Sequence, residues 1–114
     1  MNFKVFTLPK FDKQAKRLIK KFPSLEKEIA GLIESLQTNP TQGTKIALDC
    51  YKIRLSIASK GKGKSGGARV ITHILVKDTA VFLILIYDKA EQGNVTNTEI
   101  EELLKEIEVQ SKEL

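Results

Sequence analysis

The sequence predicts an α+β fold in a single domain that covers residues 1–114. Apolar side chains recur at helical spacing in the first third of the chain and again at its end. Between these stretches, from residue 50 onward, apolar and polar side chains alternate as they do in strands. The expected order is β-α-α-β-β-β-α, in which an antiparallel sheet packs against an N-terminal helical hairpin and a C-terminal helix.

The first half of the chain predicts one strand and two helices. Residues 2–8 alternate and predict a short strand. A helix follows over residues 9–22, with one apolar stripe and a coat of lysine and arginine. Ser24 is the expected N-cap of a second helix, which ends before Asn39-Pro40. Because the turn between the helices is short, they are expected to form an antiparallel hairpin.

The middle of the chain predicts three strands. Over Cys50–Ala58 one face is apolar, and Lys52 and Arg54 lie on the other face. A glycine-rich basic segment then leads to a strand over Ala68–Lys77. Val81–Tyr87 is apolar on both faces and is therefore expected at the centre of the sheet.

The final helix carries a clear start signal. Thr96 and Glu99 have the spacing of a capping box, in which each residue bonds the backbone N–H of the other. Ile100, Leu103 and Ile107 lie in the apolar stripe that follows. We expect this acidic helix to dock its stripe on the sheet and to shield the cationic face.

Composition narrows the classes of function. The chain carries a net charge of +5 and has no apolar run of the roughly 20 residues that a membrane span needs. Cys50 is the only cysteine, so no internal disulfide or cysteine zinc site is expected. No metal or other cofactor is expected, and with no secretory signal segment a cytoplasmic location is predicted. The positive charge gathers in residues 1–22 and 45–77, which fits either nucleic acid binding or a solvated surface.

The segment from Ala58 to Ser65 matches a loose phosphate-binding loop motif. A working loop of this kind lies between a parallel strand and a helix, whereas here a strand is expected to follow. Nucleotide hydrolysis is therefore not predicted. The segment is predicted to be a mobile basic hairpin loop. Its candidates to bind phosphate are Lys60, Lys62 and Lys64.

A stronger constellation is expected on the cationic face of the strands. Its members are Lys52, Arg54, Arg69 and His73. If Ser56–Ala58 pairs with Ala68–Val70, Arg69 falls close to Arg54. Arginines bind phosphate oxygens in a bidentate fork, and a lysine beside them can act as a base. Such a cluster suits metal-independent RNA cleavage, in which the 2′-OH attacks the adjacent phosphate. A solvated edge of an amphipathic sheet is the alternative.

Three segments together resemble the RelE/ParE toxin superfamily of bacterial toxin–antitoxin modules. They are Cys50–Leu55, Gly66–Ile71 and Ile86–Lys89. The Gly-Lys-Ser-Gly-Gly-x-Arg-Val-Ile stretch is most similar to the HigB-type RelE branch. The resemblance implies an mRNA interferase that cuts translated messages in the ribosomal A site, and a cognate antitoxin that blocks it.

The resemblance also implies roles for individual residues. Lys52 and Arg54 match a cationic pair, one member of which is proposed as the general base. Arg69 matches a phosphate-binding arginine, and Lys89 lies where a further catalytic arginine is found. The C-terminal catalytic tyrosine of the family is not matched.

Val95 or Thr96 stands at the position of that missing tyrosine. Tyr87 and His73 are left as candidates for the general acid. The gap also keeps two alternatives open, a ParE-like inhibitor of DNA gyrase and an inactive relic that only binds antitoxin.

The first helix offers a candidate surface for ribosomal RNA, through its cationic side chains. They are Lys13, Lys16, Arg17 and Lys20. The predicted partners are the antitoxin and the ribosome with its mRNA and rRNA, but no membrane. Homodimers and toxin–antitoxin hetero-oligomers are both compatible with the sequence.

Overall fold

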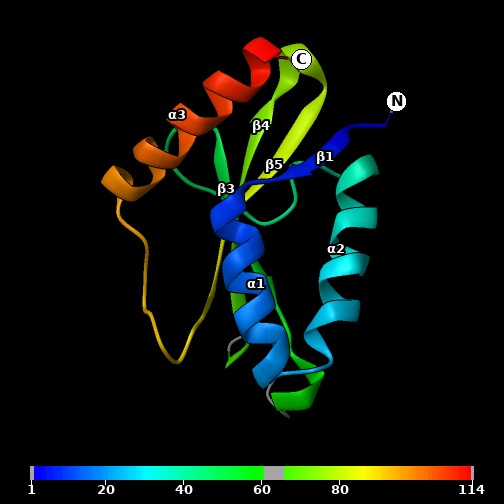
Figure 1. Ribbon diagram of the computed structural model, residues 1–114. Coiled ribbons are helices and arrows are strands. Elements are labelled where there is room, and N and C mark those ends of the chain that lie inside the picture. The colour runs from blue at the N-terminus through cyan, green and yellow to red at the C-terminus, as the bar shows by residue number, and fades with distance from the viewer. Residues whose placement is uncertain (1, 61–65, 114) are drawn as a thin grey trace.

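Helices cover both faces of a central sheet in the computed structural model, which describes residues 2–60 and 66–113 (Figure 1). The elements, in chain order, are β1 (Lys4–Thr7), α1 (Pro9–Lys21), α2 (Leu25–Thr38), β2 (Thr44–Lys45), β3 (Cys50–Leu55), β4 (Ala68–Leu75), β5 (Ala80–Asp88) and α3 (Asn97–Glu113). The predicted α+β class and the order of the main elements are confirmed. The two-residue strand β2 was not predicted.

The five strands form one sheet in the order β1-β5-β4-β3-β2. Strands β2 to β5 are antiparallel neighbours, and this pairing was predicted for β3, β4 and β5. Strand β1 instead lies parallel to β5, with Val5 beside Val81, so the sheet is mixed rather than wholly antiparallel. The helical hairpin carries the chain from β1 at one edge of the sheet to β2 at the other edge.

Alternate residues of β4 divide the interior into two cores. Val70 and Ile74 pack in the core that includes α1 and α2, whereas Ile71 packs in the core that includes α3. Neighbouring residues of a strand point to opposite faces of its sheet. The helical hairpin and α3 therefore cover opposite faces, and the docking of α3 on the sheet is confirmed.

The ends of the helices follow from local chemistry. Pro9 begins α1, where the missing N–H of proline costs nothing. Ser24 takes the N-cap position of α2 as predicted, but its hydroxyl makes no capping bond. It accepts a hydrogen bond from the backbone N of Ser59 at 2.9 Å instead, and it donates one to Glu28 at 3.2 Å. These bonds tie α2 to the 3-10 turn Ala58–Lys60, which follows β3.

The capping box of α3 is confirmed. The backbone N of Glu99 donates to Oγ1 of Thr96 at 3.2 Å, and the backbone N of Thr96 donates to Oε1 of Glu99 at 3.4 Å. Ile100, Leu103 and Ile107 are buried against the sheet. Within residues 2–60 and 66–113, no helix is both long and apolar enough to cross a membrane.

Candidate functional site

Arg54, Arg69 and Tyr87 form a row across three neighbouring strands. Arg54 of β3 pairs with Arg69 of β4, and Arg69 pairs with Tyr87 of β5. Directly paired residues in adjacent strands share a face of the sheet, with Cα atoms about 4.5–5.5 Å apart. The predicted proximity of Arg69 to Arg54 is thus confirmed. We call these three residues the cation–tyrosine row.

The register that creates this row differs from the predicted one. Leu55, rather than residues 56–58, pairs with Ala68. Gly67 permits this close approach, since a Cβ atom there would lie 2.2 Å from the carbonyl oxygen of Leu55. The chain after the loose phosphate-loop motif enters β4 rather than a helix, as predicted.

Lys52 lies beside the row on β3. It is two residues from Arg54, which places both side chains on the same face about 7 Å apart by strand rise. Lys52 is half-buried, and Arg54 is exposed. The structure therefore brings together Lys52, Arg54 and Arg69 as the sequence predicted.

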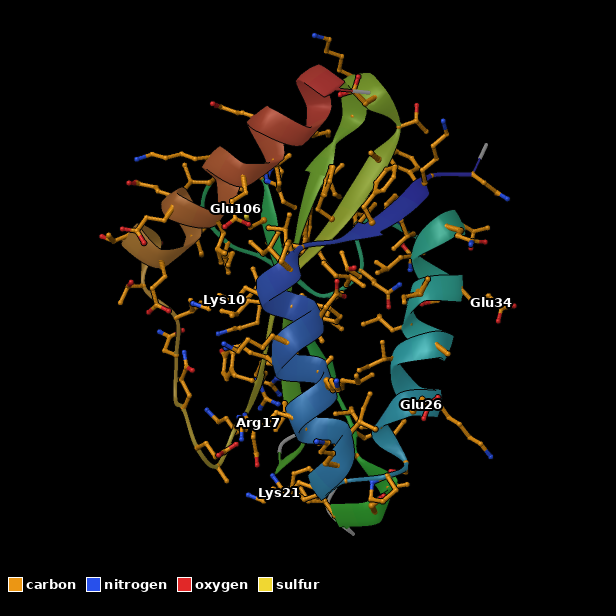
Figure 2. The ribbon with its side chains drawn as sticks, in the orientation of Figure 1. Lys10, Arg17, Lys21, Glu26, Glu34 and Glu106 are labelled. Atoms are coloured by element: carbon orange, nitrogen blue, oxygen red, sulfur yellow. The ribbon has the colours of Figure 1, made fainter. Side chains whose placement is uncertain are left out.

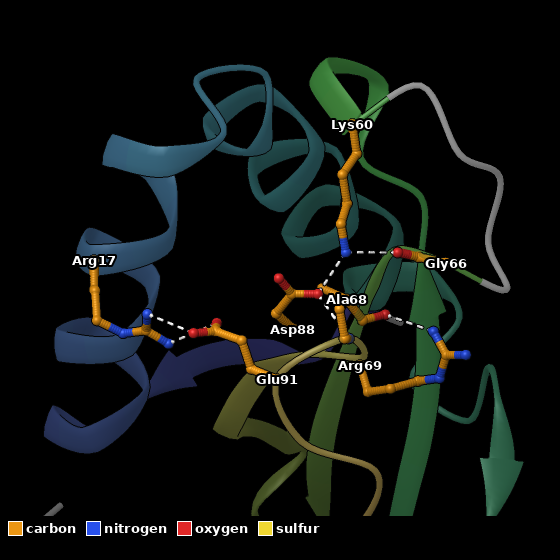
Figure 3. A network of polar contacts seen from close by, with 8 residues as sticks. Arg17, Lys60, Gly66, Ala68, Arg69, Asp88 and Glu91 are labelled. Atoms are coloured by element: carbon orange, nitrogen blue, oxygen red, sulfur yellow. Dashed lines mark hydrogen bonds and ion pairs between the residues drawn. The ribbon is translucent and has the colours of Figure 1, made fainter.

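Arg69 is nearly covered, with 5% of its surface exposed. Its Nη1 donates to the carbonyl oxygen of Ala68 at 3.1 Å (Figure 3). A buried guanidinium held by the backbone keeps a fixed orientation. A guanidinium fixed in this way can meet a phosphate without first being ordered.

Tyr87 ends the row on β5, which lies between β1 and β4, and is 3% exposed. Among the residues that the structure describes, its hydroxyl has no hydrogen-bond partner. Burial raises the pKa of Tyr87, and Arg69 opposes the rise while Glu99 adds to it. A phenol in this setting stays protonated at neutral pH and can donate a proton.

Glu99 was not anticipated beside the row. It lies in the first turn of α3, and Val95 and Ile100 from the same region pack in the core that contains Tyr87. The capping box and the docking of this helix were expected from the sequence, but the proximity of Glu99 to Tyr87 was not. The start of α3 therefore covers the tyrosine end of the row.

His73 lies away from the row. It shares the face of Arg69, as predicted, but it pairs with Cys50 and Phe82, and Ile71 separates it from Arg69 along β4. Its Nδ1 is 3.5 Å from Sγ of Cys50. Burial lowers the pKa of His73, which keeps the imidazole neutral at pH 7. The structure does not bring His73 together with the cations.

Lys89 follows the end of β5 and is exposed. Its backbone N donates to the carbonyl oxygen of Gly67 at 3.1 Å, which extends the pairing of β4 and β5 beyond the last ladder pair. Lys89 therefore lies at the same end of the sheet as the row.

Lys60 is engaged inside the protein (Figure 3). Its Nζ is 2.5 Å from Oδ1 of Asp88 and donates to the carbonyl oxygen of Gly66 at 2.8 Å. It also lies 5.3 Å from the centre of the Phe22 ring. Because this ammonium is already committed, we remove Lys60 from the candidate phosphate-binding set. Lys62 and Lys64 lie outside the described residues.

The predicted cations of α1 lie on its surface. All four of them are exposed: Lys13, Lys16, Arg17 and Lys20. Arg17 donates to both carboxylate oxygens of Glu91, at 3.1 and 3.3 Å. Figure 2 shows Lys10 and Arg17 on the side of α1 toward the connection between β5 and α3. Lys10, Lys13 and Arg17 contribute to the lining of a hollow of about 550 Å³ on this side.

Ligands for a metal ion do not converge in the described parts of the chain. No three side chains of His, Cys, Asp or Glu lie close enough together there. The row and Lys52 together bring two guanidinium groups, an amine and a phenol to one face of the sheet.

Comparison with known proteins gives a family and a fold. Residues 3–113 match the family model described as the RelE toxin of the RelE/RelB toxin–antitoxin system. A doubly substituted variant of the E. coli toxin RelE in the free state is similar in structure, with a TM-score of 0.61 and 16% identity over 94% of this chain and 99% of that one.

Two further E. coli structures are also similar. The isolated RelE toxin shares 20% identity at a TM-score of 0.49, over 92% of this chain and 98% of that one. The same doubly substituted variant, in complex with a peptide of the antitoxin RelBc, shares 18% identity at a TM-score of 0.47, over 90% of this chain and 93% of that one. Because the family model covers nearly the whole sequence, the chain belongs to the RelE toxin family.

Proposed function

We propose that this protein is the toxin of a toxin–antitoxin module and acts as an mRNA endoribonuclease on the ribosome. The observation that carries the proposal is the cation–tyrosine row, in which two arginines and a protonated phenol share one sheet face. Lys52 lies beside the row on the same face. This set supplies a base, an acid and a phosphate clamp without a metal ion.

The reaction begins when a base removes the proton of a ribose 2′-OH. The oxygen attacks the neighbouring phosphorus, the bond to the 5′-oxygen breaks, and an acid protonates that leaving oxygen. A 2′,3′-cyclic phosphate and a free 5′-OH are formed. Negative charge builds on the phosphate oxygens during the attack, so fixed cations stabilise the transition state more than the ground state.

Three cations act on the phosphate and the 2′-OH: Lys52, Arg54 and Arg69. Arg54 and Arg69 approach a phosphate from adjacent strands, where each guanidinium can bind two of its oxygens. Lys52 is the proposed base, because it is the lysine of β3 and lies two residues from Arg54 on the same face. Lys89, at the same end of the sheet, is a further cation for the substrate.

Tyr87 is the proposed general acid. The family's C-terminal tyrosine is not matched in this sequence. Val95 or Thr96 stands at its position, and Val95 is buried while Thr96 caps α3. Tyr87 instead lies in line with both arginines, and its raised pKa keeps the proton available. His73 is a weaker candidate because Ile71 separates it from Arg69.

The covered position of Tyr87 sets a condition on the substrate. With 3% of the tyrosine exposed, a phosphate reaches the hydroxyl only when the adjoining first turn of α3 moves. Lys52 and Arg54 are more open. The message is therefore expected to meet Arg54 first and to displace the start of α3 as it settles on the row.

Two macromolecular partners belong to this proposal. The exposed lysines of α1 suit sequence-independent contacts to ribosomal RNA phosphates. A cognate antitoxin is expected because the family is defined by a toxin–antitoxin system. The ribosome is a cytoplasmic partner, so we propose that the protein acts in the cytoplasm.

Cleavage is tested with programmed ribosomes that carry a defined codon in the A site, and with the same message free of ribosomes. We expect cleavage only with ribosomes, and a 5′-OH on the downstream fragment. Replacing one transition-state donor typically lowers the rate by about 10²- to 10³-fold, which is the loss expected for Arg69→Ala and Arg54→Ala. Lys27→Ala, which removes an exposed lysine of α2, is the charge-matched control and should retain full activity.

Cleavage that survives Arg69→Ala in the folded protein would exclude the row as the active site. If the wild type cuts no message, the missing family tyrosine gains weight and the ParE-like alternative becomes the better one. Inhibition of DNA gyrase supercoiling by the wild type would then support it. A protein that does neither but binds its antitoxin would be the inactive relic.

A further inference from the structure

A buried ion pair joins Lys60 and Asp88 beneath the end of the sheet that carries the row (Figure 3). Only 11% of the Lys60 side chain and 1% of the Asp88 side chain are exposed. Oδ1 of Asp88 also accepts a hydrogen bond from the backbone N of Ala90 at 3.0 Å. The pair is thus fixed by bonds to the backbone as well as by charge.

The pair connects segments that bear three residues of the proposed active site. Lys60 holds the carbonyl of Gly66, three residues before Arg69. Asp88 stands between Tyr87 and Lys89 on β5 and pairs with Ala68 of β4. One ammonium therefore fastens the beginning of β4 to the end of β5.

The pair lies behind the row rather than in it. Tyr87 and Asp88 are neighbours in β5, so their side chains point to opposite faces of the sheet. Lys60 approaches Asp88 from the side of Phe22, which packs against the core that includes α1 and α2. Neither Lys60 nor Asp88 is placed to touch a substrate on the α3 face.

Stability alone is a poor explanation for this arrangement. Removing two charges from water is costly, and apolar or neutral replacements of similar volume are often as stable as a buried pair. What a buried pair with several backbone partners does provide is a fixed geometry. That geometry matters here because the pair's backbone bonds lie within three residues of Arg69, Tyr87 and Lys89.

We propose that Lys60 and Asp88 are positioning residues, which hold the Arg69 strand and the Tyr87–Lys89 segment in register for the reaction. This inference rests on the proposed RNA cleavage. Arg69 and Tyr87 must address the same phosphate from adjacent strands, and a displacement of about 1 Å in such a set can cost about 100-fold in rate.

The test uses the full chain with Lys60→Met and Asp88→Asn combined. This double variant removes both charges while keeping volume, and the asparagine oxygen can still accept from Ala90. Three quantities are measured: the single-turnover cleavage rate on programmed ribosomes, the Kd for those ribosomes, and amide hydrogen exchange by mass spectrometry. Lys60→Arg serves as the conservative variant, because its guanidinium can keep the bond to Asp88. Ile29→Val, in the α2 core, controls for a general loss of stability.

We expect the double variant to fold, to bind ribosomes as the wild type does, and to cleave about 10- to 100-fold more slowly. Its hydrogen exchange should speed up at residues 66–69 and 88–91 but not in α2. Lys60→Arg should recover most of the rate, and Ile29→Val should keep it. An unchanged cleavage rate in the double variant, or an equal loss in Ile29→Val, would overturn the inference.

Failure of the proposed function would look different. In that case the wild type itself would not cleave, and hydrogen exchange would decide the matter alone. Faster exchange confined to residues 66–69 and 88–91 in the double variant would still establish that the pair holds the two segments. Exchange equal to that of the wild type would refute the positioning role.

Discussion

Replacing Tyr87 by phenylalanine should change stability and activity in opposite directions. The hydroxyl is buried and has no hydrogen-bond partner among the described residues. A buried hydroxyl left without a partner costs about 1–3 kcal/mol in proteins. Its removal forfeits the dispersion contacts of one oxygen atom, a few pairs at about 0.1–0.2 kcal/mol each.

The cost of the unpartnered hydroxyl exceeds the dispersion contacts that its oxygen makes, so Tyr87→Phe should raise the free energy of unfolding by about 1 kcal/mol. In a domain of this size that corresponds to a rise in Tm of roughly 4 °C. The cleavage rate should fall by about 10²- to 10⁴-fold if the phenol is the general acid. A substitution that stabilises the fold and removes activity is typical of a group kept for function.

Urea unfolding at pH 7 gives the free energy, and single-turnover cleavage on programmed ribosomes gives the rate. Tyr51→Phe makes the same chemical change on the opposite face of β3, so it should leave the cleavage rate unchanged. Because burial raises the pKa of Tyr87, loss of its proton should lower the wild-type rate only above the usual tyrosine pKa of about 10. A loss of 1 kcal/mol or more in Tyr87→Phe would refute the reasoning, since it would show that the hydroxyl is satisfied.

Three further outcomes follow from individual side chains. Burial raises the pKa of Cys50 to about 12, so iodoacetamide should label it in urea but not in the native protein at about pH 8. Burial lowers the pKa of His73 in the folded protein, so the unfolded chain binds more protons as the pH falls. The urea midpoint should therefore decrease from about pH 7 to pH 5, and His73→Leu should reduce that decrease. The exposed pair between Arg17 and Glu91 should contribute under about 1 kcal/mol to stability. Glu91→Gln should nevertheless tighten ribosome binding at low salt and steepen its salt dependence, because it frees a guanidinium for phosphate.

Most of the fold could be predicted because its signals are local. Helical spacing located α1 and α2 to within a residue or two, and the capping box located the start of α3. The parallel pairing of β1 with β5 could not be predicted, because alternation shows that a segment is a strand but not which neighbour it takes. The two residues of β2 are too few to leave a pattern.

The candidate site was predicted in part. Alternation placed Lys52 and Arg54 on one face, and this required no knowledge of the partner strand. The direct pairing of Arg54 with Arg69 depends on where β4 begins, and the sequence pattern left that register off by more than one residue. Close contact at Gly67 settles the register, and only coordinates reveal such a contact.

Lys60 shows why a charge pattern is a weak guide to binding. Its sequence neighbours are glycine and lysine, which is typical of a solvated basic loop. Its partner Asp88 is 28 residues away at the end of an apolar strand, where a carboxylate without a cation would be costly to bury. That cost was the available signal: an aspartate that closes a buried strand requires a cation, and Lys60 supplies it.

At the end of the sheet that carries the row, the two faces therefore have different roles. On the α3 face, two guanidinium groups and a buried hydroxyl with no hydrogen-bond partner among the described residues lie in one row. On the opposite face, Lys60 and Asp88 are opposite charges with their bonds satisfied. Because each strand places adjacent residues on opposite faces, the satisfied pair can fix the backbone from which the row projects. Within the row, Tyr87→Phe should then alter activity without loss of stability, whereas substitutions behind the row should loosen both segments together.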